Sequence, residues 1–168
     1  ARTLQQTRRI TTKRLMKPYY RKATVKDAIL VANNLREEDR MEMEGLGDHP
    51  LSLSFIVQLS SNTISFFDED GSIAGIGGII PDMREHVGQV WMLCTPIVTR
   101  KPHTFVRHLK RWLNEQHEYR LLWNIADARN IFHHKLLKIL GFKGIKIVYP
   151  PPHQLPYYEI VKLCVQQQ

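Results

Sequence analysis

The strongest constraint on the fold of this chain is the order in which strand-like and helix-like patterns follow one another. Residues 63–67 and 72–80 flank Asp70-Gly71, a dipeptide typical of hairpin turns, so these two segments should pair as strands. The expected strands are 19–24, 63–67, 72–80, 89–95, 121–126, 142–149 and 157–165, and the expected helices are 24–32, 36–44, 105–113 and 132–140, with a further short helix within 50–59. This order predicts one α/β domain in 168 residues.

Apolar residues spaced by three and four positions define the buried faces of the two later helices. The first helix should bury Phe105, Leu109, Trp112 and Leu113 and expose Arg107, Lys110 and Arg111. The second should bury Phe132, Leu136, Ile139 and Leu140, with Gly141 as its C-terminal cap. The unbroken apolar run 90–94 is typical of a strand buried on both faces, and 121–126 should be another buried strand.

Other residue types exclude several classes of protein. Cys94 and Cys164 lack the spacing of a disulfide framework or a zinc site, which fits synthesis in a reducing cytoplasm. His133 and His134 would point about 100° apart on a helix and have no carboxylate at ligand spacing, so we expect no metal site. No apolar stretch approaches the roughly 20 residues that cross a bilayer. We expect neither secretion nor membrane insertion.

Charge is distributed unevenly along the chain, which carries a formal net charge of +8. Residues 1–26 hold nine Lys or Arg and no acid, residues 27–99 hold three against twelve acids, and residues 100–146 hold eleven against three. A bipolar domain with a cationic arm favours acidic partners such as nucleic acid, acidic protein or phosphorylated ligands, although the basic 100–146 stretch is also consistent with an ordinary solvated surface.

Residues 1–18 form a segment of their own, distinct from a domain at 19–168. They have too few large apolar residues to build a core and show no helical or strand period, so we expect an extended basic arm that gains order from a partner. The residues expected to contact that partner are Arg2, Leu4, Arg8, Arg9, Ile10, Lys13, Arg14 and Leu15.

The element order, together with the segment from Asn130 to Gly141-Phe142, resembles the acetyltransferase (GNAT) superfamily, in which an Asn opens the last helix and Gly-Phe starts the next strand. This resemblance implies a mixed central sheet flanked by helices. More narrowly, the segments VWMLCTP, RHLKRWL and LLWNIADARNIFHHKLLKILGF look like the acyltransferase-like internal virion proteins of short-tailed bacteriophages. That likeness implies a virion component made in the host cytoplasm, in a larger assembly with portal, core or tail proteins and with packaged DNA as a further partner.

Two features depart from active members of the superfamily. Their phosphate loop keeps small residues where backbone approaches the coenzyme A pyrophosphate, whereas the stretch Arg100 to Phe105 places His103 and Phe105 there and Pro102 between them. A Tyr that serves the family as general acid is replaced by Leu137, which has no proton to donate.

We therefore expect no cofactor and a degenerate coenzyme A site, and we assign no catalytic residue. The leading hypothesis is a virion structural or assembly protein. One alternative is an active N-acyltransferase that uses acetyl-CoA or another acyl-CoA, and a second is a nucleic-acid-binding protein with a basic arm. If coenzyme A binds, the expected contacts are Thr95, Arg100, Lys101, His103, Thr104 and Asn130. The residues expected to line the gap between the fourth and fifth strands are Cys94, Thr95, His103, Asn124 and Asn130.

Overall fold

The computed structural model describes residues 17–164, so the arm residues 1–16 and their expected contacts lie outside the described residues. The strands are β1 (Tyr19–Arg21), β2 (Ser61–Phe67), β3 (Ile73–Pro81), β4 (Val87–Cys94), β5 (Leu121–Asp127), β6 (Lys143–Val148) and β7 (Tyr157–Leu163). The helices are α1 (Val25–Ala32), α2 (Glu37–Gly45), α3 (Leu53–Leu59), α4 (Pro102–Asn114) and α5 (Ile131–Ile139). This order confirms the α/β prediction, and the short helix expected within 50–59 is a 3-10 turn, Pro50–Ser52, followed by α3.

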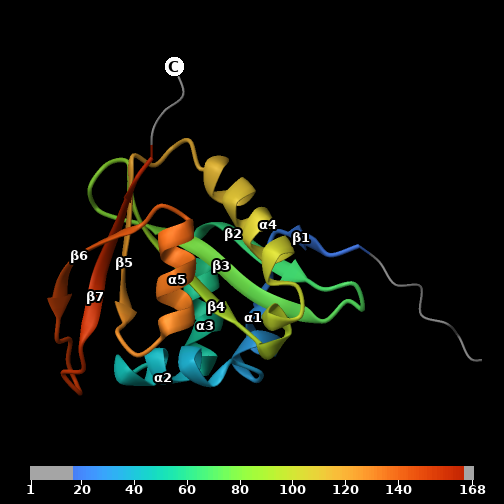
Figure 1. Cartoon of the computed structure of the whole chain (residues 1–168), viewed down its shortest axis with the longest axis horizontal. Helices are drawn as coiled ribbons and strands as arrows, with labels where there is room; N and C mark the ends of the chain where they lie inside the picture. The colour runs from blue at the N-terminus through green and yellow to red at the C-terminus, as the bar shows by residue number, and fades with distance from the viewer. Residues whose placement is uncertain (1–16, 165–168) are drawn as a thin grey trace, which may run out of the picture.

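The seven strands form one mixed sheet in the order β1-β2-β3-β4-β5-β7-β6 (Figure 1). Strands β1 to β4 are antiparallel neighbours, β4 and β5 are parallel, and β7 lies antiparallel between β5 and β6. The predicted hairpin joins β2 to β3, and Gly71 in its turn has a φ of +81°, a conformation that favours glycine.

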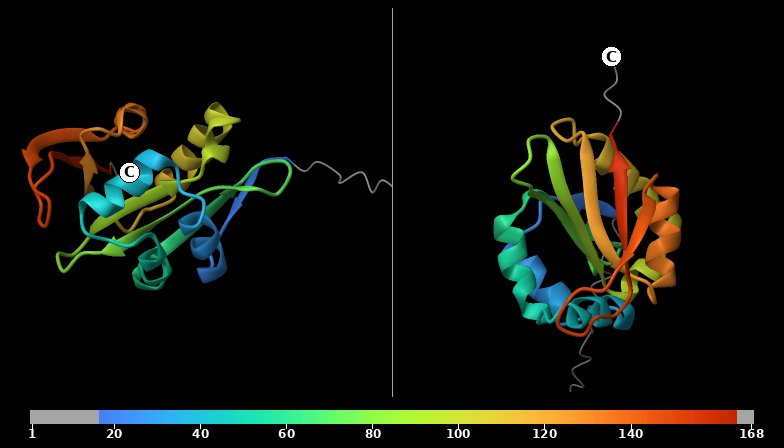
Figure 2. Two further views of the ribbon diagram at one scale, coloured as in Figure 1. Left: turned by 90° about the horizontal axis from the view of Figure 1, so that it is seen from below. Right: turned by 90° about the vertical axis from the view of Figure 1, so that its left-hand side faces the viewer.

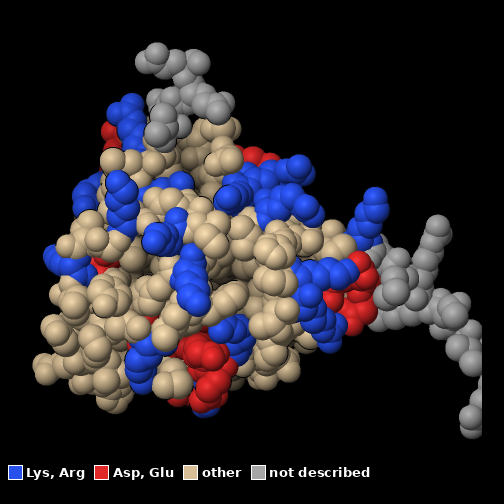
Figure 3. All heavy atoms as spheres, viewed as in Figure 1, with Lys and Arg blue, Asp and Glu red and all other residues tan. Residues whose placement is uncertain are grey.

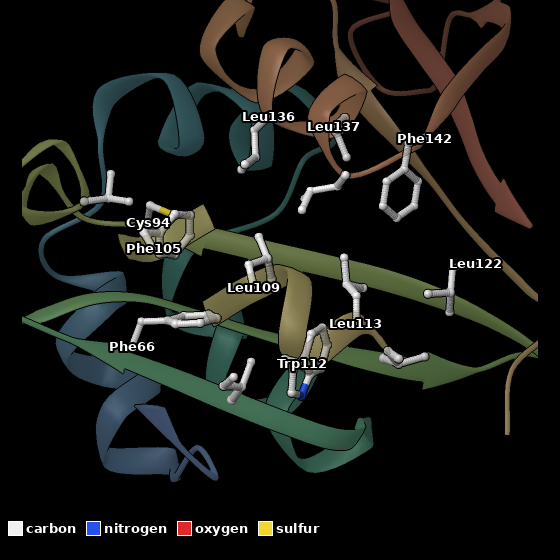
Figure 4. Packing of buried hydrophobic residues seen from close by; sticks show 14 of the residues in the cluster. Phe66, Cys94, Phe105, Leu109, Trp112, Leu113, Leu122, Leu136, Leu137 and Phe142 are labelled. Atoms are coloured by element: carbon white, nitrogen blue, oxygen red, sulfur yellow. The ribbon is translucent and has the colours of Figure 1, made fainter. Parts of the chain in front are cut away.

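Helices cover both faces of the sheet, with α1 and α3 on one side and α4 and α5 on the other (Figure 2). A larger apolar cluster fills the space between the sheet and α4 and α5, and a smaller one lies under α1 and α3. The stripe predicted for α4 is confirmed, since Phe105, Leu109, Trp112 and Leu113 are all buried (Figure 4). Within residues 17–164, none of the helices has the length and apolar character needed to span a bilayer.

The buried stripe predicted for α5 was wrong at Ile139, and Phe132 is only partly buried. Leu136 and Leu140 are buried as expected, but Ile139 is 56% exposed and Leu137 takes a place in the core. Successive residues are about 100° apart around a helix, so the buried arc is centred toward Leu137 and Leu140 and leaves Ile139 outside it. The cap was right: α5 is followed by Gly141 with a φ of +89°.

The predictions that 90–94 in β4 is buried on both faces and that 121–126 in β5 is a buried strand were also wrong in part. Side chains in the middle of both strands, including Val90, Met92 and Ile125, are only partly buried. The two strands pair only where Val87 to Gln89 lie beside Leu121 to Trp123, and beyond that point the ladder ends. Because the neighbouring strands separate, each loses cover along its inner edge, and a cavity opens between them.

Candidate functional site

The candidate site is an apolar cavity of about 160 Å³ where β4 and β5 separate. Helix α4 contributes Leu109 and Leu113 to its wall, and α5 contributes Leu137. Figure 4 shows these side chains extending from the two helices toward the same space. Leu137 has no polar atom, so this wall supplies no proton donor at the position where the resemblance implied one.

Asn124 closes the narrow end of the split between the strands. Its side-chain nitrogen donates a hydrogen bond to the backbone oxygen of Val90 at 2.7 Å, and its oxygen accepts one from Gln89 at 3.1 Å. The Asn124 side chain thus satisfies a β4 carbonyl beyond the last paired residues of β4 and β5, and buried backbone carbonyls need such partners. Asn124 also lines the cavity, so it is both a structural bridge and a polar group that a ligand would meet.

A polar network at another side of the cavity joins α2 to the start of α5. Glu42 accepts hydrogen bonds from the Asn130 side chain at 3.0 Å and from the Asp127 backbone at 3.2 Å, and its carboxylate lies 3.2 Å from Nδ1 of His133. Asn130 also donates to Asp39 at 3.0 Å. Both Glu42 and His133 line the cavity.

Burial and pairing act in opposite directions on the ionisable groups of this network. Burial disfavours the charged form of His133, but the Glu42 and Asp39 carboxylates outweigh it and raise the pKa of the imidazole above its ordinary value. Burial raises the pKa of the Asp39 carboxyl, although the backbone N–H of Cys94 and the Arg36 guanidinium favour its charged form. The cavity therefore has a paired, protonatable imidazole at its edge.

The loop before α4 holds the two cations of the expected phosphate site, Arg100 and Lys101. Both are paired with acidic side chains of the β2–β3 turn. Arg100 lies 3.0 Å from the Asp70 carboxylate and 3.4 Å from that of Asp68. Lys101 forms an ion pair with Glu69. Figure 3 shows acidic and basic side chains meeting at this end of the molecule. Three carboxylates thus neutralise the two cations.

The remaining residues expected around coenzyme A are scattered. His103 is exposed on α4, whereas Phe105 is 5% exposed and its ring lies edge-on to Phe66 at 4.9 Å between centroids. Thr95 is buried and donates to the backbone oxygen of Ile73 at 2.7 Å. Thr104 is half-buried in the first turn of α4.

Of the five side chains expected to line the gap, only Asn124 lines the cavity; the other four, Cys94, Thr95, His103 and Asn130, do not. Cys94 is a buried free thiol of the core, Thr95 and Asn130 are engaged in the hydrogen bonds given above, and His103 faces outward. These four residues come from the segments that surround the cavity, but their side chains do not line it.

The sequence interpretation missed Glu42 and His133 as cavity residues. His133 lies four residues before Leu137, so both share one helix face, and that spacing was a usable signal. Glu42 gave none, because it is far from His133 in sequence and only the packing of α2 brings them together. His133 lies 3.2 Å from the Glu42 carboxylate, and His134 contacts the Asp127 carbonyl at 2.7 Å. Residues 17–164 contain no cluster of potential metal ligands.

Solved structures of known proteins share this architecture. A GNAT-family acetyltransferase from Streptococcus pneumoniae matches 89% of this chain and 100% of its own length, with 19% identity and a TM-score of 0.62. One from Bacillus anthracis matches 89% and 96%, with 14% identity and a TM-score of 0.64. Spermidine N-acetyltransferase from Vibrio cholerae, in complex with CoA and spermine, matches 88% and 96%, with 13% identity and a TM-score of 0.65. No protein-family model and no curated protein sequence matches this chain. At these identities the likeness establishes the GNAT fold.

Proposed function

We propose that this chain, which has the GNAT fold, is a structural or assembly protein of a bacteriophage particle with a coenzyme A site that does not bind the cofactor. The loss of coenzyme A binding is inferred from the pairing of Arg100 and Lys101 with the acidic β2–β3 turn. A pyrophosphate at this loop would have to displace carboxylates and would then lie beside them. The negative charges of a phosphate and of these neighbouring carboxylates repel each other, so the arrangement opposes phosphate binding.

The backbone of the same loop does not fit the cofactor either. The family places a small residue where Phe105 stands, and here the Phe105 ring is part of the core. The loop cannot move toward a phosphate without removing that ring from its contact with Phe66. The residues present therefore do not fit acyl-CoA, and we assign no catalytic step to it. Fold alone does not restore the activity, because function resides in the site.

The virion role rests on the resemblance of three segments to internal virion proteins of short-tailed phages and on the basic arm. The chain is made in the host cytoplasm and packs into the particle against portal, core or tail proteins. Residues 1–17 contain six Lys or Arg and no acid, so an acidic groove or packaged DNA suits this segment as a partner.

Deleting residues 1–17 tests this role. All described core residues follow Pro18, so we expect the truncated chain to fold, and we expect it to be missing from particles when it complements a phage that lacks the intact gene. The circular dichroism spectrum of the purified chain gives the folding control. Particle composition, measured by mass spectrometry, gives the result. Truncated chain present at the parent level in particles would contradict the proposed role of the arm.

The alternative function is an N-acyltransferase, and one observation favours it. The cavity persists between β4 and β5, and a protonatable imidazole, His133, lies at its edge beside Glu42. Release of free thiol from acetyl-CoA in the presence of a panel of amines tests this reading. Turnover that the parent shows and a His133→Gln variant lacks would favour the enzyme over the structural role.

A further inference from the structure

Five exposed cations lie on the two helices that cover one face of the sheet. They are Arg107, Lys110 and Arg111 on α4 and Lys135 and Lys138 on α5. We call these five residues the α4–α5 basic surface, and basic side chains are spread over this side of the molecule in Figure 3. None of the five forms an ion pair with any residue between 17 and 164.

The contrast with the neighbouring loop is informative. Arg100 and Lys101 are adjacent to α4 in sequence, yet the acidic β2–β3 turn neutralises both. The next cation along the chain is Arg107, six residues after Lys101, and it is exposed and unpaired among residues 17–164. Within residues 100–146, the exposed cations without an ion pair among the described residues are the five of the α4–α5 basic surface together with Arg120 and Lys143, whereas the two loop cations are paired.

The outer face of α4 lacks what a protein partner would need. Its exposed positions are His103, Arg107, Lys110, Arg111 and Asn114, and none of them is a large apolar residue. The cores of protein interfaces are built from buried apolar and aromatic side chains with few charges. Contacts to a phosphodiester backbone need only cations and polar groups.

On α5 the two lysines lie between exposed Ile131 and Ile139, which are the first and last residues of that helix. Ile139 directly follows Lys138, and Ile131 and Ile139 lie four residues before and after Lys135, so the lysines are flanked by two single exposed apolar residues and not by a continuous apolar patch. Helices α4 and α5 cover the same side of the sheet (Figure 2), so the two lysines add to the cations on that side.

We infer that the α4–α5 basic surface binds the phosphodiester backbone of duplex DNA without reading its bases. This inference rests on the proposed packing role, since it names the partner of one surface of the particle protein. Each phosphate neutralised by a cation releases counterions from the duplex, and binding of this kind weakens steeply with salt.

Fluorescence anisotropy with a labelled duplex of random sequence, titrated with the full chain over a range of NaCl concentrations, tests the inference. The test variant is Lys110→Gln/Arg111→Gln. The matched control, Lys22→Gln/Lys26→Gln, removes the same charge from exposed positions next to and within α1, on the opposite face of the sheet. None of the four side chains is in an ion pair among residues 17–164, so the variants should fold like the parent.

We expect the test variant to bind about tenfold or more weakly at 100 mM NaCl, and its log–log salt slope to become shallower by about 1.8, or about 0.9 for each lost contact. The control should weaken binding by less than about threefold. Lys135→Gln/Lys138→Gln should behave like the test variant.

Equal losses for the test and control variants would overturn the inference, because binding would then depend only on net charge. Absence of duplex binding by the parent would overturn it too, and would leave the particle-incorporation test of the proposed function unaffected. Poly-glutamate that competes as well as unlabelled duplex at equal charge would also overturn it, in favour of an acidic polypeptide.

Discussion

Replacing Phe105 with Ala tests whether the phosphate-loop position has become part of the core. Phe105 is 5% exposed, belongs to the larger apolar cluster and meets Phe66 edge-on at 4.9 Å. Truncating a buried Phe to Ala costs about 3 to 5 kcal/mol, through lost transfer free energy and the cavity left behind. A domain of this size has a free energy of unfolding of about 5 to 15 kcal/mol, so the loss is a large part of the total.

Urea unfolding followed by circular dichroism measures this cost. At about 2 to 4 °C for each kcal/mol, the thermal midpoint should fall by roughly 6 to 20 °C. His103→Ala is the matched control, because His103 is exposed two residues away in the same helix and its loss should change the free energy of unfolding by no more than about 0.5 kcal/mol. A loss below about 1 kcal/mol for Phe105→Ala would refute the argument that the core fixes this loop.

Two further predictions concern pH. Hydrogen bonds from Ser72, and then from Arg100, lower the pKa of Asp70 from 3.8 to about 2, so the stability they confer is present above pH 4 and is lost as the pH falls from about 4 to 2. Asp70→Asn should reduce the difference between urea midpoints measured at pH 4 and pH 2, and an unchanged difference would count against the ion-paired turn. The pKa of His133 should lie above 6.5 by NMR titration and should fall in Glu42→Gln. Because that pKa is raised, the pairing stabilises the fold below pH 6.5 and is lost as the pH rises through the folded value, whereas a His133 pKa unaffected by Glu42→Gln would exclude the pairing.

Local sequence patterns were sufficient for α4 and for the β2–β3 turn, although not for the buried stripe of α5. The apolar spacing from Phe105 to Leu113 predicted the buried face of α4, and Asp70-Gly71 predicted the β2–β3 turn. Both signals depend on helix periodicity or turn conformation, which residues a few positions apart determine.

Features that depend on pairing between distant segments were out of reach. The apolar run ending at Cys94 reads as a fully covered strand, and nothing within it shows that the parallel partner diverges after Trp123. The β2–β3 turn is a second example: its sequence predicts a turn but does not indicate that Glu69 forms an ion pair with Lys101. The folded sheet determines which charged side chains lie close together, so the ion pairs of Arg100 and Lys101 could be identified only in the structure.

The most direct test of the central claim is an isothermal calorimetric titration of the full chain with acetyl-CoA, with an active acetyltransferase of the same fold as positive control. Phe105 is fixed in the core and Arg100 and Lys101 are paired with carboxylates, so we expect no saturable binding up to about 1 mM ligand, a binding free energy weaker than about −4 kcal/mol. Saturable binding with a Kd in the low micromolar range, about −8 kcal/mol, would contradict the account and restore the enzyme as the leading function.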